Sequence, residues 1–288
     1  MSRHYQSLSG PEGNWQIHYR EAGSGPPCVL LHPSPLSSAA MAPTMQVLAP
    51  MARCIAWDTP GYGYSDSLPK AWSKQDLSPY VDALRSFIIC LDLDRPLIYG
   101  SATGAQIAIE FAKQHPTLCS GLLLENLALF SAQESEAMME NYFPDIHARD
   151  DGSHLQQIWD MARQSTRYFP WNDESPAAER RSAYPNADII ADIFRDYLIA
   201  GPDYDRAYRA AFANERPEQL AGLTLPTQVI LWTDGLLGEY AQRLREVDLP
   251  DAIVLRNAGS GMSARFEALQ EAAATLLETR ARTEGMTL

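Results

Sequence analysis

The stretch DTPGYGYSD at residues 58–66 is the most informative part of this sequence. It directly follows the apolar run at 54–57, and a second glycine-bounded turn, GSATGA at 100–105, follows another apolar run at 96–99. Continuous apolar runs without polar alternation are typical of strands covered on both faces, as in a parallel sheet. Turns that follow such strands are where open α/β sheets place their sites.

The same alternation of apolar runs and helical segments continues along most of the chain. Further apolar runs occur at 28–31, 121–124, 228–232 and 252–255, and helical periodicity predicts helices over 80–91, 104–115 and 265–277. Strand–helix alternation predicts an α/β fold with a doubly wound, mostly parallel sheet. Residues 130–222 do not continue this strand–helix alternation, because their apolar spacing is helical and they are rich in aromatic residues. We therefore expect a helical cap at 130–222 and a core formed by 1–129 and 223–288.

The composition of the chain disfavours several classes of function. The chain has 23 Lys and Arg against 36 Asp and Glu, a net charge of −13, so phosphate-rich partners such as nucleic acids or anionic membranes are disfavoured. No run approaches eighteen apolar residues and the amino end, MSRHYQ, has no apolar signal core, which predicts a cytoplasmic protein without a membrane span. The four cysteines lack Cys-x-x-Cys spacing and the six histidines are scattered. We expect buried thiols, no metal site and no cofactor, and a homodimer stays open.

The order and spacing of three turns resembles the α/β-hydrolase family, in its branch with a helical cap. The turns are HPSPLSS at 32–38, DTPGYGYSD at 58–66 and GSATGA at 100–105, and the resemblance runs from about residue 17 to 277. It implies a Gly-x-nucleophile-x-Gly elbow, a strained strand-to-helix turn that exposes its central side chain. Counted onto this chain, the elbow glycines are Gly100 and Gly104, and the nucleophile position is Ala102, which has no lone pair for attack.

The resemblance also places the other triad positions. The family's histidine usually stands in an Ala-Gly-His pattern after the last strand, and here Ser260 occupies that position. Asp234 matches the family's acid, and Glu125 an alternative acid position. Without a histidine to orient, Asp234 loses this role, and a solvated or helix-capping aspartate is an equally good interpretation. Ser101 lies one residue before the apex, and we expect its side chain to point away from the pocket.

What the resemblance preserves is an oxyanion site made of backbone groups. Its donors would be the N–H of Thr103, at the start of the helix, and the N–H of Ser34, in the loop after the first parallel strand. Backbone amides do not depend on side-chain identity, so the loss of the nucleophile leaves them in place. In this family His32 would be structural, hydrogen-bonded beneath its loop. His154, in the expected cap, is either a surface residue or a base that reaches over the pocket.

Three hypotheses fit these residues. The first is an enzyme for a small, mostly apolar, carbonyl-containing substrate whose nucleophile position is altered in this chain. The second is a natural lyase, decarboxylase or isomerase that uses the oxyanion donors without a covalent intermediate. The third is a binding protein that holds a small molecule without turnover. All three exclude ester hydrolysis by the usual acyl-enzyme route, because that route needs a nucleophile and a base.

Overall fold

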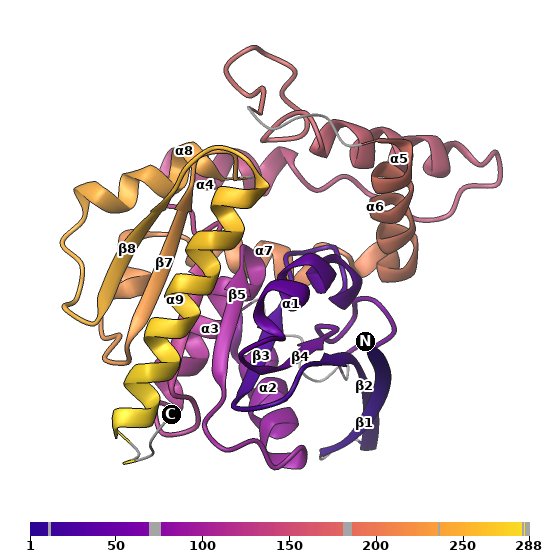
Figure 1. Cartoon of the computed structure of the whole chain (residues 1–288). Helices are drawn as coiled ribbons and strands as arrows, with labels where there is room; N and C mark the ends of the chain where they lie inside the picture. Colours follow the sequence, from indigo (N-terminus) through magenta and orange to yellow (C-terminus); the bar gives the residue numbers. More distant parts are fainter. Residues whose placement is uncertain (11–12, 69–75, 181–185, 236, 284, 286–288) are drawn as a thin grey trace.

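An eight-stranded sheet crosses the molecule in the order β1-β2-β4-β3-β5-β6-β7-β8 (Figure 1). This computed structural model describes residues 1–10, 13–68, 76–180, 186–235, 237–283 and 285. The strands are β1 Ser2–Gly10, β2 Gly13–Ala22, β3 Pro27–Leu31, β4 Arg53–Trp57, β5 Leu97–Ser101, β6 Gly121–Glu125, β7 Thr227–Trp232 and β8 Ile253–Ala258. The pairs β1–β2 and β2–β4 are antiparallel, and the pairs from β4 to β8 are parallel. The predicted doubly wound, mostly parallel sheet is confirmed.

Helices cover both faces of this sheet. They are α1 Ala42–Leu48, α2 Ser78–Cys90, α3 Thr103–Gln114, α4 Ala132–Asn141, α5 Ser153–Ser165, α6 Ala187–Ala200, α7 Arg206–Asn214, α8 Gly238–Gln242 and α9 Met262–Thr283. Short 3-10 helices lie at η1 Ser38–Met41, η3 Gly201–Asp203, η4 Pro217–Leu220 and η5 Arg243–Glu246.

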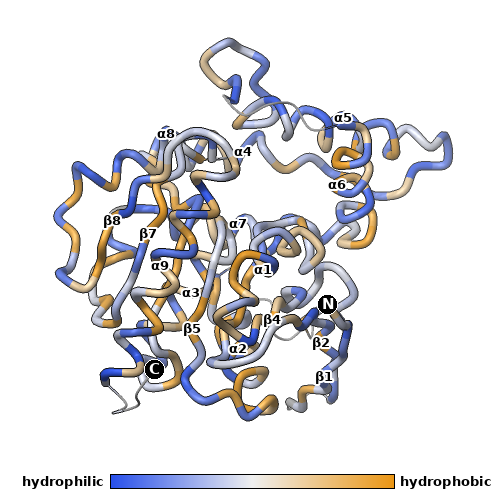
Figure 2. The backbone as a smooth tube through the Cα atoms, in the orientation of Figure 1, coloured by the Kyte–Doolittle hydropathy of each residue, from blue (hydrophilic) through white to orange (hydrophobic). Residues whose placement is uncertain are grey.

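Two apolar layers hold the sheet between the helices. In β3, Val29 and Leu31 join a cluster that includes residues of α2 and α3. Cys28 and Leu30, on the opposite face, join a cluster that includes residues of α1 and α9. Both faces of the sheet are therefore buried, which explains the continuous apolar runs of the parallel strands. Figure 2 shows this hydrophobic character along β7.

The structure departs from the sequence prediction at the amino end and at several helix termini. The hairpin of β1 and β2 was not predicted, because β1 is an exposed edge strand with little apolar pattern. Helix α3 begins at Thr103, and α9 extends from Met262 to Thr283, beyond both predicted bounds. Three of the four cysteines are buried, but Cys90 is exposed at the end of α2, and all four are free thiols.

Within the segment 130–222, the described regular elements are the helices α4 to α7 with η3 and η4, which loops connect, and an isolated bridge links Tyr168 to Glu179. Figure 1 shows α5 and α6 standing apart from the sheet, on the side of α1 and α7. They have an apolar cluster of their own, which includes Ile158, Met161 and Tyr197. Treating this segment as a separate cap domain stays a prediction. No helix in the described ranges combines the length and apolar character that a bilayer crossing requires.

Candidate functional site

The turn between β5 and α3 has the strained shape of a nucleophile elbow. Ala102, at its apex, has φ 48° and ψ −115°, a conformation uncommon for a residue with a side chain. A Cβ atom on Gly100 would lie 2.6 Å from the Gly104 carbonyl oxygen, and one on Gly104 would lie 2.2 Å from the Leu31 carbonyl oxygen. Both glycines are therefore required by close backbone contacts. The elbow is formed, and a methyl group occupies its apex.

A cavity of about 260 Å³ lies beside this turn, and we call it the elbow pocket. Ser34, Ser101, Glu125, Tyr142, Tyr208 and Arg265 are among the residues that line it. Ser101 is among the lining residues, and its Oγ accepts a hydrogen bond from Asn126 Nδ2 at 2.9 Å, while the direction of its side chain relative to the cavity stays a prediction. Ala102 is buried in an aromatic cluster with Tyr142, Phe169 and Tyr208. The apex residue therefore belongs to the same apolar cluster as three aromatic residues that line the pocket, and it is not itself among the lining residues.

A buried ion pair forms part of the pocket wall. Glu125, at the end of β6, accepts hydrogen bonds from both Nε and Nη2 of Arg265 on α9, with the Nε distance 3.0 Å. Tyr99 donates its hydroxyl to the same carboxylate at 2.5 Å, and Arg265 Nη2 also donates to Thr44 Oγ1 at 3.0 Å. Burial alone would lower the pKa of Arg265, but the adjacent Glu125 carboxylate raises it above its usual value. The carboxylate at the alternative acid position is therefore bonded to an arginine and not to an imidazole.

The predicted acid and histidine positions do meet, but outside the pocket. Ser260 Oγ and the Gly261 N–H both donate to Asp234 Oδ2, each at 2.7 Å. Gly261 directly precedes α9, so this hydrogen bond ties Asp234 to the residue before the start of that helix. Neither Asp234 nor Ser260 lines the elbow pocket.

The histidines do not supply a base to the cavity. His32 is fully buried, its Nε2 accepts the Thr59 N–H at 2.9 Å, its Nδ1 faces the Pro33 carbonyl oxygen at 3.0 Å, and burial lowers its pKa. It is thus a neutral group beneath its loop. The Nδ1 of His154 accepts the Arg149 N–H at 3.1 Å, close to the start of α5. All six histidines are described, and none of them lines the elbow pocket.

The two predicted oxyanion donors lie on neighbouring loops. The Ser34 N–H donates to Thr103 Oγ1 at 3.4 Å, a long hydrogen bond that a better acceptor would replace. Ser34 lines the elbow pocket, and Thr103 is buried directly behind it at the first position of α3. Their use as an oxyanion site stays a prediction.

Two tyrosines add hydroxyl donors from the helical segment. The hydroxyl groups of Tyr142 and Tyr208 are hydrogen-bonded to each other at 3.0 Å, and both side chains line the elbow pocket. Burial raises the pKa of Tyr208 to about 12 and that of Tyr142 well above its usual value. Both phenols therefore stay protonated at neutral pH, and because one of them donates to the other, the pair offers one free hydroxyl donor and no base.

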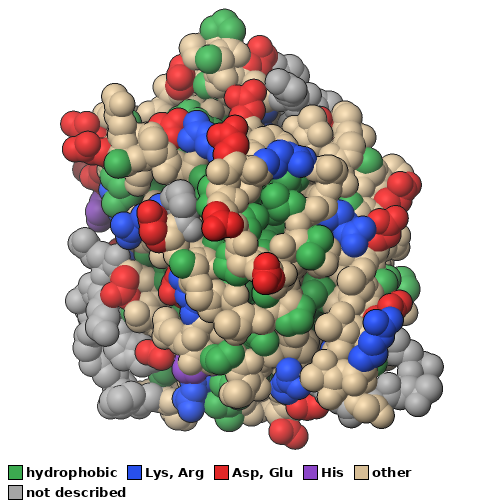
Figure 3. Space-filling model, turned by 90° about the vertical axis from the view of Figure 1, so that its left-hand side faces the viewer, with side chains coloured by type: hydrophobic (Ala, Val, Ile, Leu, Met, Phe, Trp, Pro, Cys, Tyr) green, Lys and Arg blue, Asp and Glu red, His purple; other side chains and the backbone are tan. Residues whose placement is uncertain are grey.

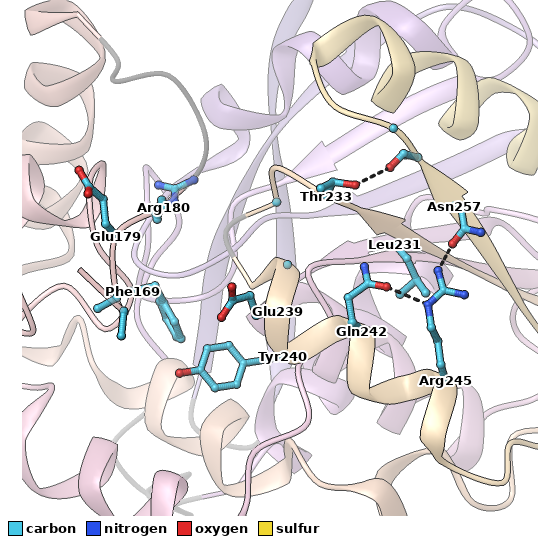
Figure 4. A pocket seen from close by; sticks show the side chains of 16 residues that line it. Phe169, Glu179, Arg180, Leu231, Thr233, Glu239, Tyr240, Gln242, Arg245 and Asn257 are labelled. Carbon is cyan, nitrogen blue, oxygen red and sulfur yellow. Dashed lines mark hydrogen bonds between the residues drawn. The ribbon is translucent and has the colours of Figure 1, made fainter. Parts of the chain in front are cut away.

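A second, larger cavity of about 530 Å³ lies next to the elbow pocket, and we call it the outer pocket (Figure 4). Its wall includes the ends of β7 and β8, helix α8 and a loop of the helical segment. Phe169 and Arg180 line both cavities, so they stand between them. Figure 3, from the β8 and α8 side, shows hydrophobic side chains at the centre of this face among acidic and basic ones. Among the described residues, no three His, Cys, Asp or Glu side chains are grouped to hold a metal ion.

The sequence profile described as the alpha/beta hydrolase family matches residues 28–274, which is most of the chain. The chain belongs to this family. It is similar to a haloalkane dehalogenase of Agrobacterium fabrum (strain C58 / ATCC 33970), at 24% identity over 93% of this chain and 89% of that protein. It is also similar to 2-hydroxy-6-oxononadienedioate/2-hydroxy-6-oxononatrienedioate hydrolase 1 of Pseudomonas putida, at 32% identity, but over only 38% of this chain and 39% of that enzyme.

Among solved structures, a bromoperoxidase from Bacillus anthracis covers 96% of this chain with a TM-score of 0.66 and 14% sequence identity, and the alignment spans 100% of that chain. Identity at this level shows that the alpha/beta hydrolase fold is shared and nothing finer.

Sequence reasoning missed several residues of the site: Arg265, Arg180, Tyr142, Tyr208 and Asn126. One signal for Arg265 was present, because it stands four residues before Leu269 on the buried face of α9, where a charge needs a partner. Nothing in the sequence placed Arg180 or the two tyrosines near the elbow, because those contacts are made by tertiary packing.

Proposed function

We propose that this chain binds a small, carbonyl-containing molecule in the elbow pocket through hydrogen bonds alone, without forming a covalent intermediate. One observation carries the proposal: the pocket beside the elbow is lined by hydrogen-bond donors, while the apex of the elbow is a methyl group and no imidazole lines the cavity. Donors aimed into a largely apolar cavity bind a carbonyl oxygen and stabilise negative charge on it.

The surrounding geometry supports this choice. Tyr142 and Tyr208 hold their protons, and the Ser34 N–H makes only a long bond to Thr103. Ala102 is packed under aromatic rings, so a nucleophile at this position would be shielded from the cavity. The name of the Pseudomonas putida relative specifies substrates with an oxo group, which is the functional group that such donors recognise.

The experiment compares ketones with hydrocarbons of the same shape. Acetophenone and propiophenone are titrated against the chain by ligand-observed NMR at pH 7.5. Ethylbenzene and propylbenzene are the matched compounds without a carbonyl group. We expect the ketones to bind more tightly, and Tyr208→Phe to weaken ketone binding by about 2- to 10-fold, the usual worth of one neutral hydrogen bond.

Tyr204→Phe is the matched control, because the Tyr204 hydroxyl donates to the Pro144 carbonyl oxygen and Tyr204 lines neither the elbow pocket nor the outer pocket. Equal binding of ketones and hydrocarbons would show that the donors do not recognise a carbonyl group. The same conclusion would follow if both tyrosine variants had the same effect.

A non-hydrolytic enzyme is the second candidate, favoured by the number of donors that meet at one cavity. Stabilisation of an enolate by such donors lowers the barrier to decarboxylation, carbon–carbon cleavage or isomerisation. The assay follows β-keto acids and 1,3-diketones by NMR. Turnover that is lost in Thr103→Pro, which removes the backbone N–H, and kept in Thr103→Val, which removes only the hydroxyl, would support this candidate. Turnover that survives Thr103→Pro would exclude the role of this amide.

A further inference from the structure

Arg180 is a largely buried cation without a counter-ion. Its Nη1 donates to the Ser165 carbonyl oxygen at 2.9 Å, while its Nε is buried and has no acceptor among the described residues. In the ranges that the structure covers, no carboxylate forms an ion pair with this guanidinium. Burial lowers the pKa of Arg180, and the nearby hydroxyl groups of Tyr142 and Tyr208 oppose that shift only in part. Buried charges in proteins are normally paired, so this one points to a missing anion.

The place of Arg180 shows where that anion would lie. Arg180 lines the elbow pocket and the outer pocket, and among the described residues only Phe169 also lines both. Figure 4 shows both side chains at the edge of the outer pocket that belongs to the helical segment. Because Nη1 is already bonded to a carbonyl oxygen and Nε is buried, Nη2 is the donor left for a ligand. A carboxylate oxygen accepts a charge-assisted hydrogen bond from such a guanidinium nitrogen.

The charges around the elbow pocket set the charge of the ligand. Among the residues that the structure describes, three ionisable groups with full charges line it: Arg180, Arg265 and Glu125. Arg265 and Glu125 neutralise each other through their bidentate pair, which leaves one positive charge. One uncompensated cation in a chain whose net charge is −13 matches a monoanion and not a phosphate dianion.

We propose that Arg180 anchors the carboxylate of a small monocarboxylic acid whose apolar part occupies the elbow pocket. The apolar part would contact Met41, Phe169, Ile193 and Trp232, which line that cavity, and the carboxylate would lie at the junction with the outer pocket. This inference rests on the proposed function, since it uses the same cavity, and adds the class of ligand. It needs no turnover, so a failure to find catalysis leaves it standing.

The test uses phenylacetate, 3-phenylpropionate, 4-phenylbutyrate and 4-oxo-4-phenylbutyrate, each compared with its primary carboxamide, by isothermal titration at pH 7.5. We expect at least one acid to bind at least about 30-fold more tightly than its amide, the loss that follows when one partner of a buried charge pair is missing. Arg180→Met removes this preference. Arg180→Lys keeps the charge but lacks the planar guanidinium. Its preference for acids over amides should be intermediate between that of the native chain and that of Arg180→Met.

Arg163→Met is the matched control, because Arg163 pairs with Asp160 on α5 and lines neither pocket. Thermal unfolding separates binding from structure: removing an unpaired buried charge leaves the melting temperature of Arg180→Met equal to or above that of the native chain. A melting temperature that falls in Arg180→Met would assign Arg180 a structural role and overturn the proposal.

Other outcomes would also overturn it. These are an Arg180→Met variant that still prefers acids, a panel in which no acid binds, and inorganic phosphate that binds Arg180 as tightly as the best acid. A preference lost in Arg245→Met instead would move the anion site to the outer pocket, where Arg245 is exposed and bonded to neutral side chains. If the acids bind and acetophenone and propiophenone do not, Arg180 remains the carboxylate-binding residue and the proposed carbonyl site is rejected.

Discussion

Removing one member of the Glu125–Arg265 pair should destabilise the chain strongly. The two residues are 2% and 8% exposed, so Glu125→Gln leaves a buried guanidinium without its counter-charge. Loss of one partner from a buried pair costs about 3–5 kcal/mol. At about 2–4 °C per kcal/mol for a domain of this size, the melting temperature should fall by about 6–20 °C. Arg265→Met leaves the Glu125 carboxylate without its counter-ion, so it should lower the melting temperature by a similar amount.

The double variant Glu125→Leu with Arg265→Met gives the sharper readout, because replacing both partners of a buried pair by apolar groups is often close to neutral. Stability is measured by thermal and urea unfolding monitored by circular dichroism. Glu278→Gln is the control, since Glu278 pairs with Arg282 on the exposed surface of α9 and should change stability by at most about 1 kcal/mol. If Glu125→Gln costs no more than Glu278→Gln, the pair is not in a low-dielectric wall and our account of the pocket is wrong.

Three further predictions concern the elbow and the helical segment. Gly104→Ala should destabilise the fold by about 1–3 kcal/mol or more, because its Cβ would lie 2.2 Å from a backbone oxygen, whereas Gly259→Ala, with no atom nearer than 3.7 Å, should be near neutral in urea unfolding. Burial raises the pKa of Asp196 to about 6, so the folded chain binds a proton that the unfolded chain releases near pH 4, and stability falls as pH rises from about 4 to 6. Asp196→Asn should therefore be more stable than the native chain at pH 7.5 by up to about 3 kcal/mol and equal to it below pH 4, and a difference independent of pH would contradict this. Ala102→Ser should hydrolyse p-nitrophenyl acetate no faster than the native chain, because no imidazole lines the pocket; turnover restored by Ala102→His but not by Ala102→Ser would instead favour an altered nucleophile position.

The elbow was predictable because its two glycines have a fixed spacing in the sequence. Gly100 and Gly104 are needed by contacts within the turn and with the neighbouring strand, and their spacing in the sequence carries that information. The parallel strands were predictable for a similar reason, since both of their faces are buried and their residues are continuously apolar. The exposed edge hairpin of β1 and β2 has no such signature and was missed.

The composition of the site was less predictable, because it depends on contacts between distant segments. Glu125 and Arg265 are separated by 140 residues, and nothing near Glu125 in the sequence indicates an arginine partner. The hydrogen bond between Ser101 and Asn126 was not predicted, because Asn126 follows the next strand. Arg180 belongs to the helical segment, whose position over the sheet is set by packing and not by a motif.

The most direct test of the central claim is the intact mass of the native chain after incubation with a fluorophosphonate probe. A pocket that binds its ligand without a nucleophile predicts an unchanged mass, with a serine hydrolase labelled under the same conditions as the positive control. A single stoichiometric adduct, mapped to Ser101, Ser34 or Ser260, would reveal an activated serine and contradict the account.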